Sequence, residues 1–385
     1  MTDEPRYIPF LEPELPDFAL VSEDFAKICA SGVFSNGGQF DAALSREVSA
    51  YLGVRDCVPV ANATLGLMLA IETLARRDGG RKVLLPAFTF PAAALAVEWA
   101  GFEPLFCDID ASSWQPTVPA GLLAQRREEI ALIVLCNTFG APADIDTWND
   151  AADGCGIPML VDSASGLGGT YVDGRRFGQA GCVEVFSMHA TKAFAVGEGG
   201  LVVADAPAIA QSIRRLRNFG FDEQRRCTGL GINAKLSEFH AAIACRVLER
   251  YDQILAQRRE IAAAYRRRLE PYGYVFQRHG ERSPYQAVPV RIPDGVSRGE
   301  LRRHLKTAGI ETAQYFSMPL QQHPRYERCE TVDALAVTNR VARSILSLPM
   351  SNHLSAADVE RVCAAVIEHT SRPTPHRVSG IGPDE

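Results

Sequence analysis

Lys192 is the residue whose surroundings most clearly indicate covalent chemistry. It lies between Ser187 and Gly200, with alanine and phenylalanine after it and a cluster of glycines beyond them. Apolar surroundings lower the pKa of a lysine, and an unprotonated amine forms a Schiff base with a carbonyl. Glycines let the backbone approach a bulky ligand. The alternative is a surface lysine on a glycine-rich loop, although Lys192 belongs to no run of solvated charges.

Asp162 ends an apolar run that begins at Ile157 and is followed by small residues. A carboxylate in that position can pair with a cationic ring nitrogen, bind Mg²⁺ or cap the following turn. A metal ion would need more carboxylates nearby. The nearest, Asp173 and Glu184, fall in a polar turn and in a predicted strand. The pairing and capping alternatives therefore remain.

Thr64 and Phe90 each stand where an apolar run gives way to a predicted helix. Thr64 follows Val58–Val60 and precedes an amphipathic helix over Leu65–Ala75. A hydroxyl and free amides at a helix N-terminus bind phosphate, although many such threonines only cap the helix. Phe90 precedes Pro91, a residue that favours the first position of a helix. Its ring could stack on a planar ligand or pack in the core.

These four positions together supply an amine for a Schiff base, a carboxylate for a ring nitrogen, a phosphate site and an aromatic ring for stacking. Pyridoxal phosphate needs this set, because its aldehyde condenses with lysine and its protonated ring serves as an electron sink. The combination predicts pyridoxal 5′-phosphate as the cofactor more strongly than any one residue does.

The elements that must position these residues form an α/β fold. Short apolar runs alternate with longer amphipathic stretches between about residues 58 and 205, as in a mostly parallel sheet flanked by helices. Ligands of such sheets bind beyond the carboxyl ends of the strands, which is where the four residues lie. Seven strands are predicted, namely Val58–Val60, Lys82–Leu85, Pro104–Asp108, Ala131–Cys136, Ile157–Asp162, Val183–Phe186 and Leu201–Ala204.

The second half of the sequence predicts a smaller α+β domain. Apolar residues at helical spacing over Leu236–Leu269 indicate one or two connecting helices. A strand over Tyr285–Ile292 and helices over Arg298–Ala308 and Ala356–His369 follow. We expect an N-terminal arm and first helix over 1–30, a large cofactor-binding domain over 31–250, a small domain over 251–375 and a loose tail over 376–385.

Composition narrows the class of protein. The chain has 385 residues, 46% of them hydrophobic, and a formal net charge of −6. This charge gives no basic surface for nucleic acid, and no apolar run is long enough to cross a membrane. The ten cysteines are scattered without paired spacing and are expected to be reduced thiols, and the eight histidines show no spacing suited to a metal. We expect a cytoplasmic protein without a bound metal.

The motifs around these residues resemble the DegT/DnrJ/EryC1/StrS family of sugar aminotransferases, which are fold-type I pyridoxal-phosphate enzymes with an aspartate aminotransferase-like fold. Ser187-Met-His-Ala-Thr-Lys followed by Gly197-Glu-Gly-Gly is the most specific element. The resemblance covers most of the chain. Its other motifs are Gly37-Gly-Gln-Phe, Asn62-Ala-Thr, Pro86-Ala-Phe-Thr-Phe, Ala100-Gly-Phe-Glu-Pro-Leu-Phe-Cys-Asp-Ile-Asp, Asp162-Ser-Ala, Arg217-Asn-Phe-Gly, Gly231-Ile-Asn-Ala-Lys and Leu346-Ser-Leu-Pro-Met.

The resemblance implies two catalytic residues. Lys192 would bind the cofactor as a Schiff base and then carry a proton between substrate and cofactor, and Asp162 would pair with the pyridinium nitrogen. The sequence departs from the family at Ser165. The family usually has glutamine or histidine there, beside the phenolic oxygen of the cofactor, and a shorter hydroxyl changes the reach.

The remaining implied residues bind the cofactor. Ala63, Thr64 and Ser187 would hold its phosphate, and Phe90 would lie against its ring. Asn233 would reach the phosphate of the neighbouring subunit's cofactor, so the resemblance implies a homodimer with shared active sites.

The resemblance also implies the reaction: transamination of a nucleotide-linked keto sugar, most similar to members that form 4-amino-4,6-dideoxy sugars, with glutamate as the donor. An aminocyclitol or another small ketone is an alternative substrate. A third hypothesis for the function is a regulator that binds the cofactor without turnover, although the full set of catalytic residues argues against it. A nicotinamide dehydrogenase is disfavoured, because no G-x-G-x-x-G joins the first strand and helix.

Overall fold

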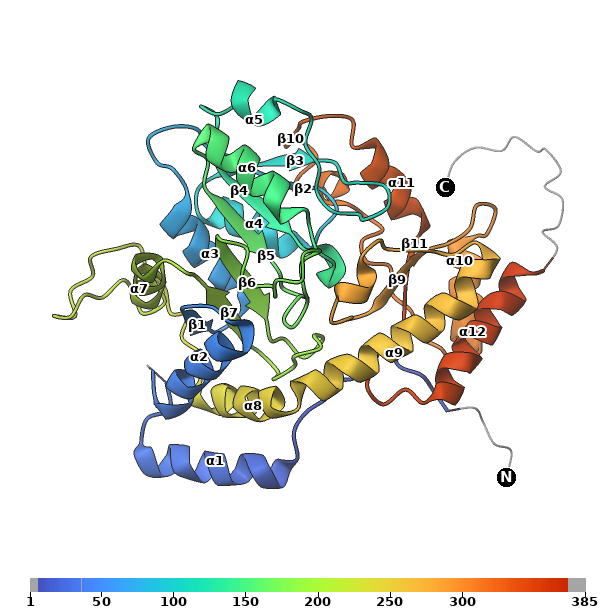
Figure 1. Ribbon diagram of the computed structural model, residues 1–385, viewed down its shortest axis with the longest axis horizontal. Coiled ribbons are helices and arrows are strands. Elements are labelled where there is room, and N and C mark those ends of the chain that lie inside the picture. The colour runs from blue at the N-terminus through green and yellow to red at the C-terminus, as the bar shows by residue number, and fades with distance from the viewer. Residues whose placement is uncertain (1–5, 36, 373–385) are drawn as a thin grey trace.

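A computed structural model describes residues 6–35 and 37–372, and its centre is an eight-stranded sheet (Figure 1). The strand order is β1-β7-β6-β5-β4-β2-β3-β10. The bounds are β1 Cys57–Val60, β2 Lys82–Pro86, β3 Glu103–Cys107, β4 Ile130–Cys136, β5 Met159–Asp162, β6 Val183–Ser187, β7 Gly200–Val203 and β10 Glu330–Thr331.

The sheet is parallel except at one side. Strands β3, β2, β4, β5 and β6 pair in parallel, whereas β7 is antiparallel to both β6 and β1. Every residue of β4 is buried, as expected for a central strand covered on both faces. The parallel strands end at one edge of the sheet, and Asp162 and Ser187 are the last residues of β5 and β6.

Helices cover both faces of this sheet, and the side chains of successive strand residues alternate between two hydrophobic clusters. One cluster joins the sheet to α2, α6 and α8, and the other joins it to α3, α4 and α7. The helices of this region are α1 Phe18–Ser31, α2 Gln39–Leu52, α3 Ala63–Leu74, α4 Pro91–Trp99, α5 Leu122–Gln125, α6 Ile145–Cys155, α7 Pro207–Leu216 and α8 Glu238–Glu249.

A second core is built on the three-stranded sheet β11-β9-β8. Its strands are β8 Val275–Phe276, β9 Val288–Arg291 and β11 Ile345–Leu348, and its helices are α10 Arg298–Thr307 and α12 Ala356–Thr370. Helix α9, Tyr251–Leu269, joins the cores: Leu255 packs in a cluster of the large sheet and Tyr265 in the cluster of the small sheet. Figure 1 shows α9 running from the end of α8, below the large sheet, to α10 and α12 of the small core.

The structure confirms the α/β fold and contains all seven predicted strands, with ends shifted by at most two residues. The sheet has an eighth strand, β10, because two residues from far along the chain pair in parallel with β3. Helix α11, Ala336–Ser344, follows β10 and packs partly beside Trp114 of the large domain. The predicted domain boundaries therefore stay predictions, and the tail over 376–385 lies outside the described residues.

The predicted strand over Tyr285–Ile292 is shorter than expected. Regular pairing begins only at Val288, because residues 283–287 contact the segments that follow β4 and β5: Ser283 bonds to Phe139, and Gln286 to Ser165. All ten cysteines are free thiols. Over the part of the chain that the structure describes, no helix combines the length and apolar character needed to cross a membrane.

Candidate active site

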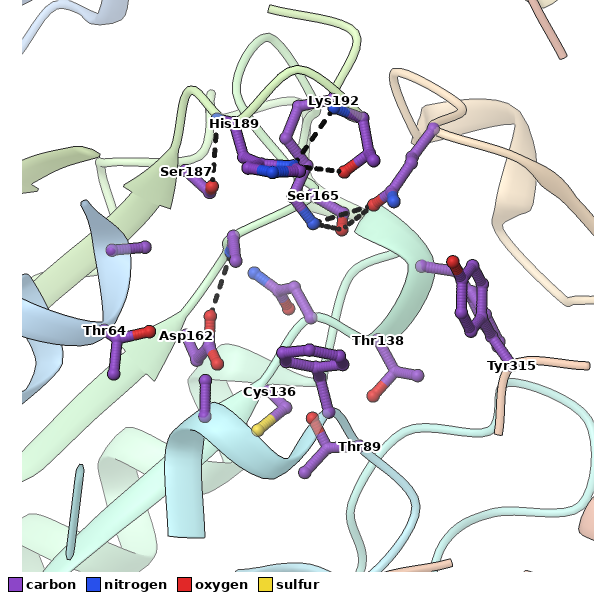
Figure 2. Close-up of a pocket in the computed structure, with 18 of the residues that line it drawn as sticks. Thr64, Thr89, Cys136, Thr138, Asp162, Ser165, Ser187, His189, Lys192 and Tyr315 are labelled. Carbon is purple, nitrogen blue, oxygen red and sulfur yellow. Dashed lines mark hydrogen bonds between the residues drawn. The ribbon is translucent and has the colours of Figure 1, made fainter. Parts of the chain in front are cut away.

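A cavity of about 450 Å³ opens at the edge where the parallel strands end. Segments from both cores line it (Figure 2). Of the residues predicted for the site, those in its wall are Ala63, Thr64, Phe90, Asp162, Ser165, Ser187 and Lys192. These residues come from segments spread between Ala63 and Lys192 in the sequence, so the tertiary fold brings them together.

Lys192 is part of the cavity wall and not of a surface loop. Its Nζ donates to Ser165 Oγ at 3.0 Å and to Gln286 Oε1 at 2.8 Å. Burial lowers the pKa of Lys192 to about 8, although the Asp162 carboxylate opposes this effect. A substantial fraction of the amine is therefore uncharged at a mildly alkaline pH, as a nucleophile requires.

Asp162 is buried at the end of β5, and its Oδ1 accepts a hydrogen bond from the Ala164 N–H at 2.9 Å. Burial raises the pKa of Asp162, and the Ala164 N–H and the charge of Lys192 oppose that shift. A cation placed next to Asp162 would favour the ionised carboxylate. Among the described residues no group of three or more histidine, cysteine, aspartate or glutamate side chains could hold a metal ion.

Helix α3 begins at the cavity, two residues earlier than predicted. Asn62 is its N-cap, because its side chain accepts a hydrogen bond from the Leu65 N–H at 2.9 Å. The alternative that Thr64 is the cap is therefore wrong, and Ala63 and Thr64 form the first turn. Amides of a first helical turn have no partner within the helix and favour an anion. Ser187, at the end of β6, lines the same side (Figure 2).

Of the two neighbouring phenylalanines, one packs in the core and the other lines the cavity. Phe88 is fully buried, whereas Phe90 is 59% exposed and lines the cavity. Phe90 is also the residue before Pro91, at which α4 starts, so the helix start holds its backbone in place. Phe90 is therefore open to a flat ligand, and its contact with the cofactor ring stays a prediction.

Several residues of the cavity wall were not predicted from the sequence. Gln286 approaches Lys192 from the small-domain side, and Tyr315 and Phe316 add an aromatic wall, with Phe316 stacked on Phe139 at 5.4 Å between ring centroids. None of them follows a strand of the large sheet, so the rule that led to Lys192 could not find them. Asn137, which follows β4, could have been found by that rule.

Asn233 is the one predicted site residue that does not line the cavity of its own chain. It is exposed, and its Oδ1 accepts a hydrogen bond from Lys235 Nζ at 2.7 Å. It belongs to the segment between α7 and α8, which extends away from the rest of the molecule (Figure 1).

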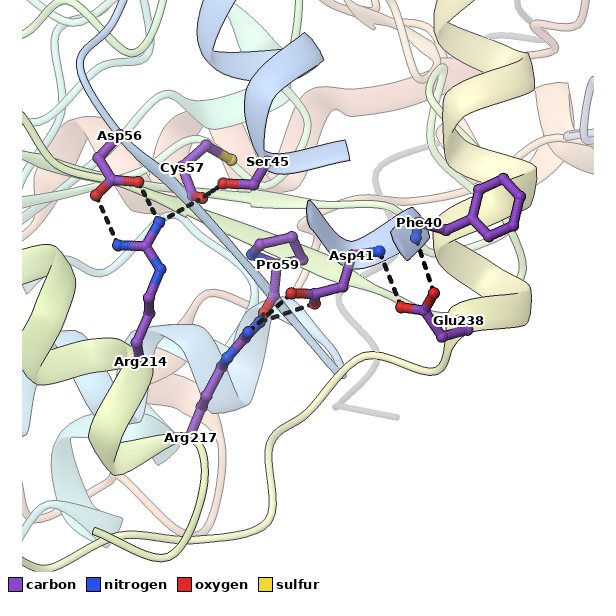
Figure 3. A network of polar contacts seen from close by, with 9 residues as sticks. All are labelled: Phe40, Asp41, Ser45, Asp56, Cys57, Pro59, Arg214, Arg217 and Glu238. Carbon is purple, nitrogen blue, oxygen red and sulfur yellow. Dashed lines mark hydrogen bonds and ion pairs between the residues drawn. The ribbon is translucent and has the colours of Figure 1, made fainter. Parts of the chain in front are cut away.

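Both ends of this segment are held against α2 (Figure 3). At one end, the buried Arg217 guanidinium donates to both carboxylate oxygens of Asp41, at 3.0 and 2.9 Å. At the other end, the Glu238 carboxylate accepts from the backbone N–H groups of Phe40 and Asp41, at 2.8 and 2.9 Å. The base of the segment is therefore fixed. Asn233 lies in this base, because it forms a β-bridge with Asn218 and the next residue, Ala234, accepts a hydrogen bond from the Ala61 N–H.

Comparison with known families decides the identity of the fold. Residues 19–367 match the DegT/DnrJ/EryC1/StrS aminotransferase family. The chain belongs to this family. It is a pyridoxal-phosphate-dependent aminotransferase, as the cavity residues indicated.

Similar proteins align over nearly the whole chain. Protein Rv3402c of Mycobacterium tuberculosis is 38% identical over 94% of this chain and 90% of its own. The dTDP-4-amino-4,6-dideoxy-D-glucose transaminase of Escherichia coli is 27% identical over 93% and 97%. The crystal structure of DesI in the presence of its TDP-sugar product superposes with a TM-score of 0.87 at 31% identity, covering 96% of this chain and 94% of that one.

The residues present fit the cofactor of the DegT/DnrJ/EryC1/StrS family. The carboxyl of Asp162 is buried with only a backbone N–H as a direct hydrogen-bond donor among the described residues, so it suits a cationic ring nitrogen. The first turn of α3 and Ser187 suit a phosphate, and Lys192 suits an aldehyde.

Proposed function

We propose that this aminotransferase converts a nucleotide-linked keto sugar, specifically a 4-keto-6-deoxy sugar, to the amino sugar with glutamate as donor. The observation that carries the proposal is that Lys192 and Asp162 line one cavity with the first turn of α3. The names of two relatives support the substrate class, because the Escherichia coli enzyme is a transaminase of a dTDP-sugar and DesI was solved with a TDP-sugar product.

Each residue has a distinct role in this proposal. Pyridoxal phosphate, when bound, supplies an aldehyde that amines attack and a ring that takes up an electron pair. Lys192, as a neutral amine, accepts the proton from the carbon that bears the donor's amino group and returns a proton to the sugar carbon. Asp162 keeps the ring nitrogen protonated.

The binding residues orient the substrate and the cofactor. Ala63 and Thr64 hold the phosphate through amide N–H groups and a hydroxyl, and Ser187 adds a second hydroxyl. Phe90 packs against the flat ring and excludes water from one of its faces.

The first experiment tests the assignment of Lys192. The Lys192→Ala protein should lose the yellow absorbance of the covalently bound cofactor and all turnover, whereas Lys306→Ala, an exposed residue on α10, should keep both. A Lys192→Ala protein that remained yellow and active would refute the proposal.

The second experiment tests the substrates. Glutamate and glutamine are first mixed separately with the purified enzyme, and the loss of yellow absorbance identifies the donor. A panel of dTDP-, UDP- and GDP-linked keto sugars and of ketocyclitols is then added, and the return of that absorbance identifies the acceptor. If only a ketocyclitol restored the absorbance, the substrate would be a cyclitol instead of a nucleotide-linked sugar, and the product would be an aminocyclitol. No response to any amino donor would favour the regulator without turnover.

We further propose a homodimer in which Asn233 completes the active site of the partner. The support is that Asn233 is exposed, does not line the cavity of its own chain and lies at the fixed base of the segment. Mixed dimers of Lys192→Ala and Asn233→Ala chains distinguish the possibilities. If Asn233 serves the partner, one site of each mixed dimer contains both native residues and activity returns. If Asn233 serves its own chain, both sites remain defective and the mixture stays inactive.

A further inference from the structure

Gln286 forms a closed triangle with the reactive amine and a serine of the large domain. Its Oε1 lies 2.8 Å from Lys192 Nζ and 2.6 Å from Ser165 Oγ, and Lys192 Nζ lies 3.0 Å from Ser165 Oγ. Ser165 follows β5 and Gln286 precedes β9, so the contact joins segments 121 residues apart in the chain.

The chemistry of the amine fixes the orientation of the Gln286 amide. A lysine ammonium has three donors and no acceptor, so the atom facing it must be Oε1 and not Nε2. Ser165 accepts from Lys192 and therefore points its own hydrogen at the same Oε1. Within residues 6–35 and 37–372, no group accepts a hydrogen bond from Gln286 Nε2.

The backbone on either side of Gln286 is held by buried groups. The Tyr285 carbonyl accepts from the buried Arg258 guanidinium at 2.8 Å. The Tyr285 N–H donates to Ser283 Oγ at 2.9 Å, and that hydroxyl donates to the Phe139 carbonyl at 2.7 Å. These contacts hold the backbone of Gln286 in one position, and a residue that orients another side chain needs such a fixed position.

Gly140 makes this approach possible. Its φ of +78° is in the left-handed region, and a Cβ there would lie 2.6 Å from the Ser165 carbonyl oxygen and 2.8 Å from Ser283 Oγ. The segments that carry Ser165 and Gln286 therefore meet across a glycine, and any larger residue would push them apart.

We propose that Gln286 is a positioning residue for Lys192: its amide oxygen, shared with Ser165, holds the amine in the cavity and stabilises the protonated amine. The proposal rests on the role of Lys192 proposed above. The other charged or titratable groups in the cavity wall are Asp162 on β5, Cys136 on β4, His189 and Glu198 on the segment between β6 and β7, and Tyr315. These groups are unchanged in the variants below, so a shift in the titration of Lys192 reports the local acceptor.

The test measures the amine directly, without substrate. The full chain is freed of cofactor, labelled briefly with acetic anhydride across a pH series, and the modification of Lys192 is quantified by mass spectrometry. Gln286→Leu removes the acceptor and should lower the pKa of Lys192 by about one pH unit. Gln286→Glu keeps the oxygen and adds a negative charge, so it should raise the same pKa by about one unit.

Two further variants complete the design. Ser165→Ala removes the more distant acceptor and should lower the pKa of Lys192 by less than Gln286→Leu does. Gln253→Leu changes an exposed glutamine on α9 and should leave the pKa of Lys192 unchanged. If Gln286→Leu does not fold, as judged by circular dichroism, the opposite signs of the shifts in Ser165→Ala and Gln286→Glu carry the test.

The proposal is overturned if the pKa of Lys192 is the same in Gln286→Leu as in the wild type, or if Gln286→Leu and Gln286→Glu move it in the same direction. A purely structural role for Gln286 would not produce shifts of opposite sign. Failure of the sugar panel would leave this result untouched, and an unchanged pKa would leave the aminotransferase assignment untouched, so the two proposals fail separately.

Discussion

Replacing Lys192 by methionine should stabilise the cofactor-free protein at neutral pH. Methionine has nearly the same length but no charge to bury. In the folded chain, burial lowers the pKa of Lys192 from the usual 10.5 to about 8. A difference of about 2.5 pH units corresponds to roughly 3 kcal/mol at about 1.4 kcal/mol per unit.

The sign follows from proton linkage. Below about pH 8 the amine is protonated in both states, and the folded chain bears the full cost of the buried charge. Between about pH 8 and the usual 10.5 the unfolded chain holds more protons than the folded one, so stability rises with pH. The cost is therefore present at neutral pH and disappears as the pH rises through the unfolded value.

The assay is urea denaturation of wild type and Lys192→Met, both freed of cofactor, at about pH 7.5 and about pH 10. The stability advantage of the methionine variant should be about 2 kcal/mol larger at the lower pH, since part of the unfolded lysine is still protonated at the higher one. Hydrogen bonds lost to Ser165 and Gln286 reduce the advantage at both pH values, and the comparison removes most of that loss.

A matched substitution separates ionisation of Lys192 from general effects of alkali. Lys306→Met changes an exposed lysine on α10 and should show no such dependence on pH. An advantage of Lys192→Met that is equal at both pH values would refute the reasoning, because it would mean that the pKa of Lys192 is the same in the folded and the unfolded chain.

Three other substitutions have outcomes that the structure specifies. Asp162→Asn should keep the cofactor's absorbance yet lower kcat by about 100-fold or more, because it removes one partner of a buried charge pair; steady-state kinetics and spectra measure both. Burial raises the pKa of Glu184 from 4.5 to about 7. The folded chain therefore binds the proton more tightly, and the stability of wild type relative to Glu184→Gln should fall by about 3 kcal/mol as the pH rises from about 4.5 to about 7.5 in urea titrations. A stability difference between wild type and Glu184→Gln that did not change with pH would contradict the raised pKa of Glu184. Gly140→Ala should destabilise the fold by about 1–3 kcal/mol, from its left-handed φ and the contact with Ser165. Gly154→Ala, a helical site with nothing near the added carbon, should be neutral or stabilising by comparison in the same urea experiment.

The sequence predicted the part of the site that follows the strands of the large sheet. Lys192, Asp162 and Ser187 could be found because parallel strands end at one edge, so residues distant in sequence share that edge by rule. The choice between Asn62 and Thr64 as helix cap could not be made, because both residue types cap helices and the turn before α3 decides between them.

The remaining wall residues depend on packing between the two cores. Gln286 and Phe316 reach the cavity only because the small domain packs beside the large sheet, and no local pattern encodes that packing. The two residues of β10 are likewise too few for a periodicity. Ser165 is shorter than the glutamine or histidine that the family usually has at its position. The structure places the side chain of Gln286 within hydrogen-bond distance of it.

Helix α9 is a structural link through which order in one core can affect the other. Its N-terminal turns, with Tyr251 and Leu255, complete the core of the large sheet, and its C-terminal turns, with Ile261 and Tyr265, complete that of the small sheet. A helix propagates its order from turn to turn, so fraying that begins in one core is transmitted along the backbone to the other. We therefore expect heat or denaturant to melt both cores in one transition, and we expect either half, cut free at this helix, to be less stable than in the whole chain.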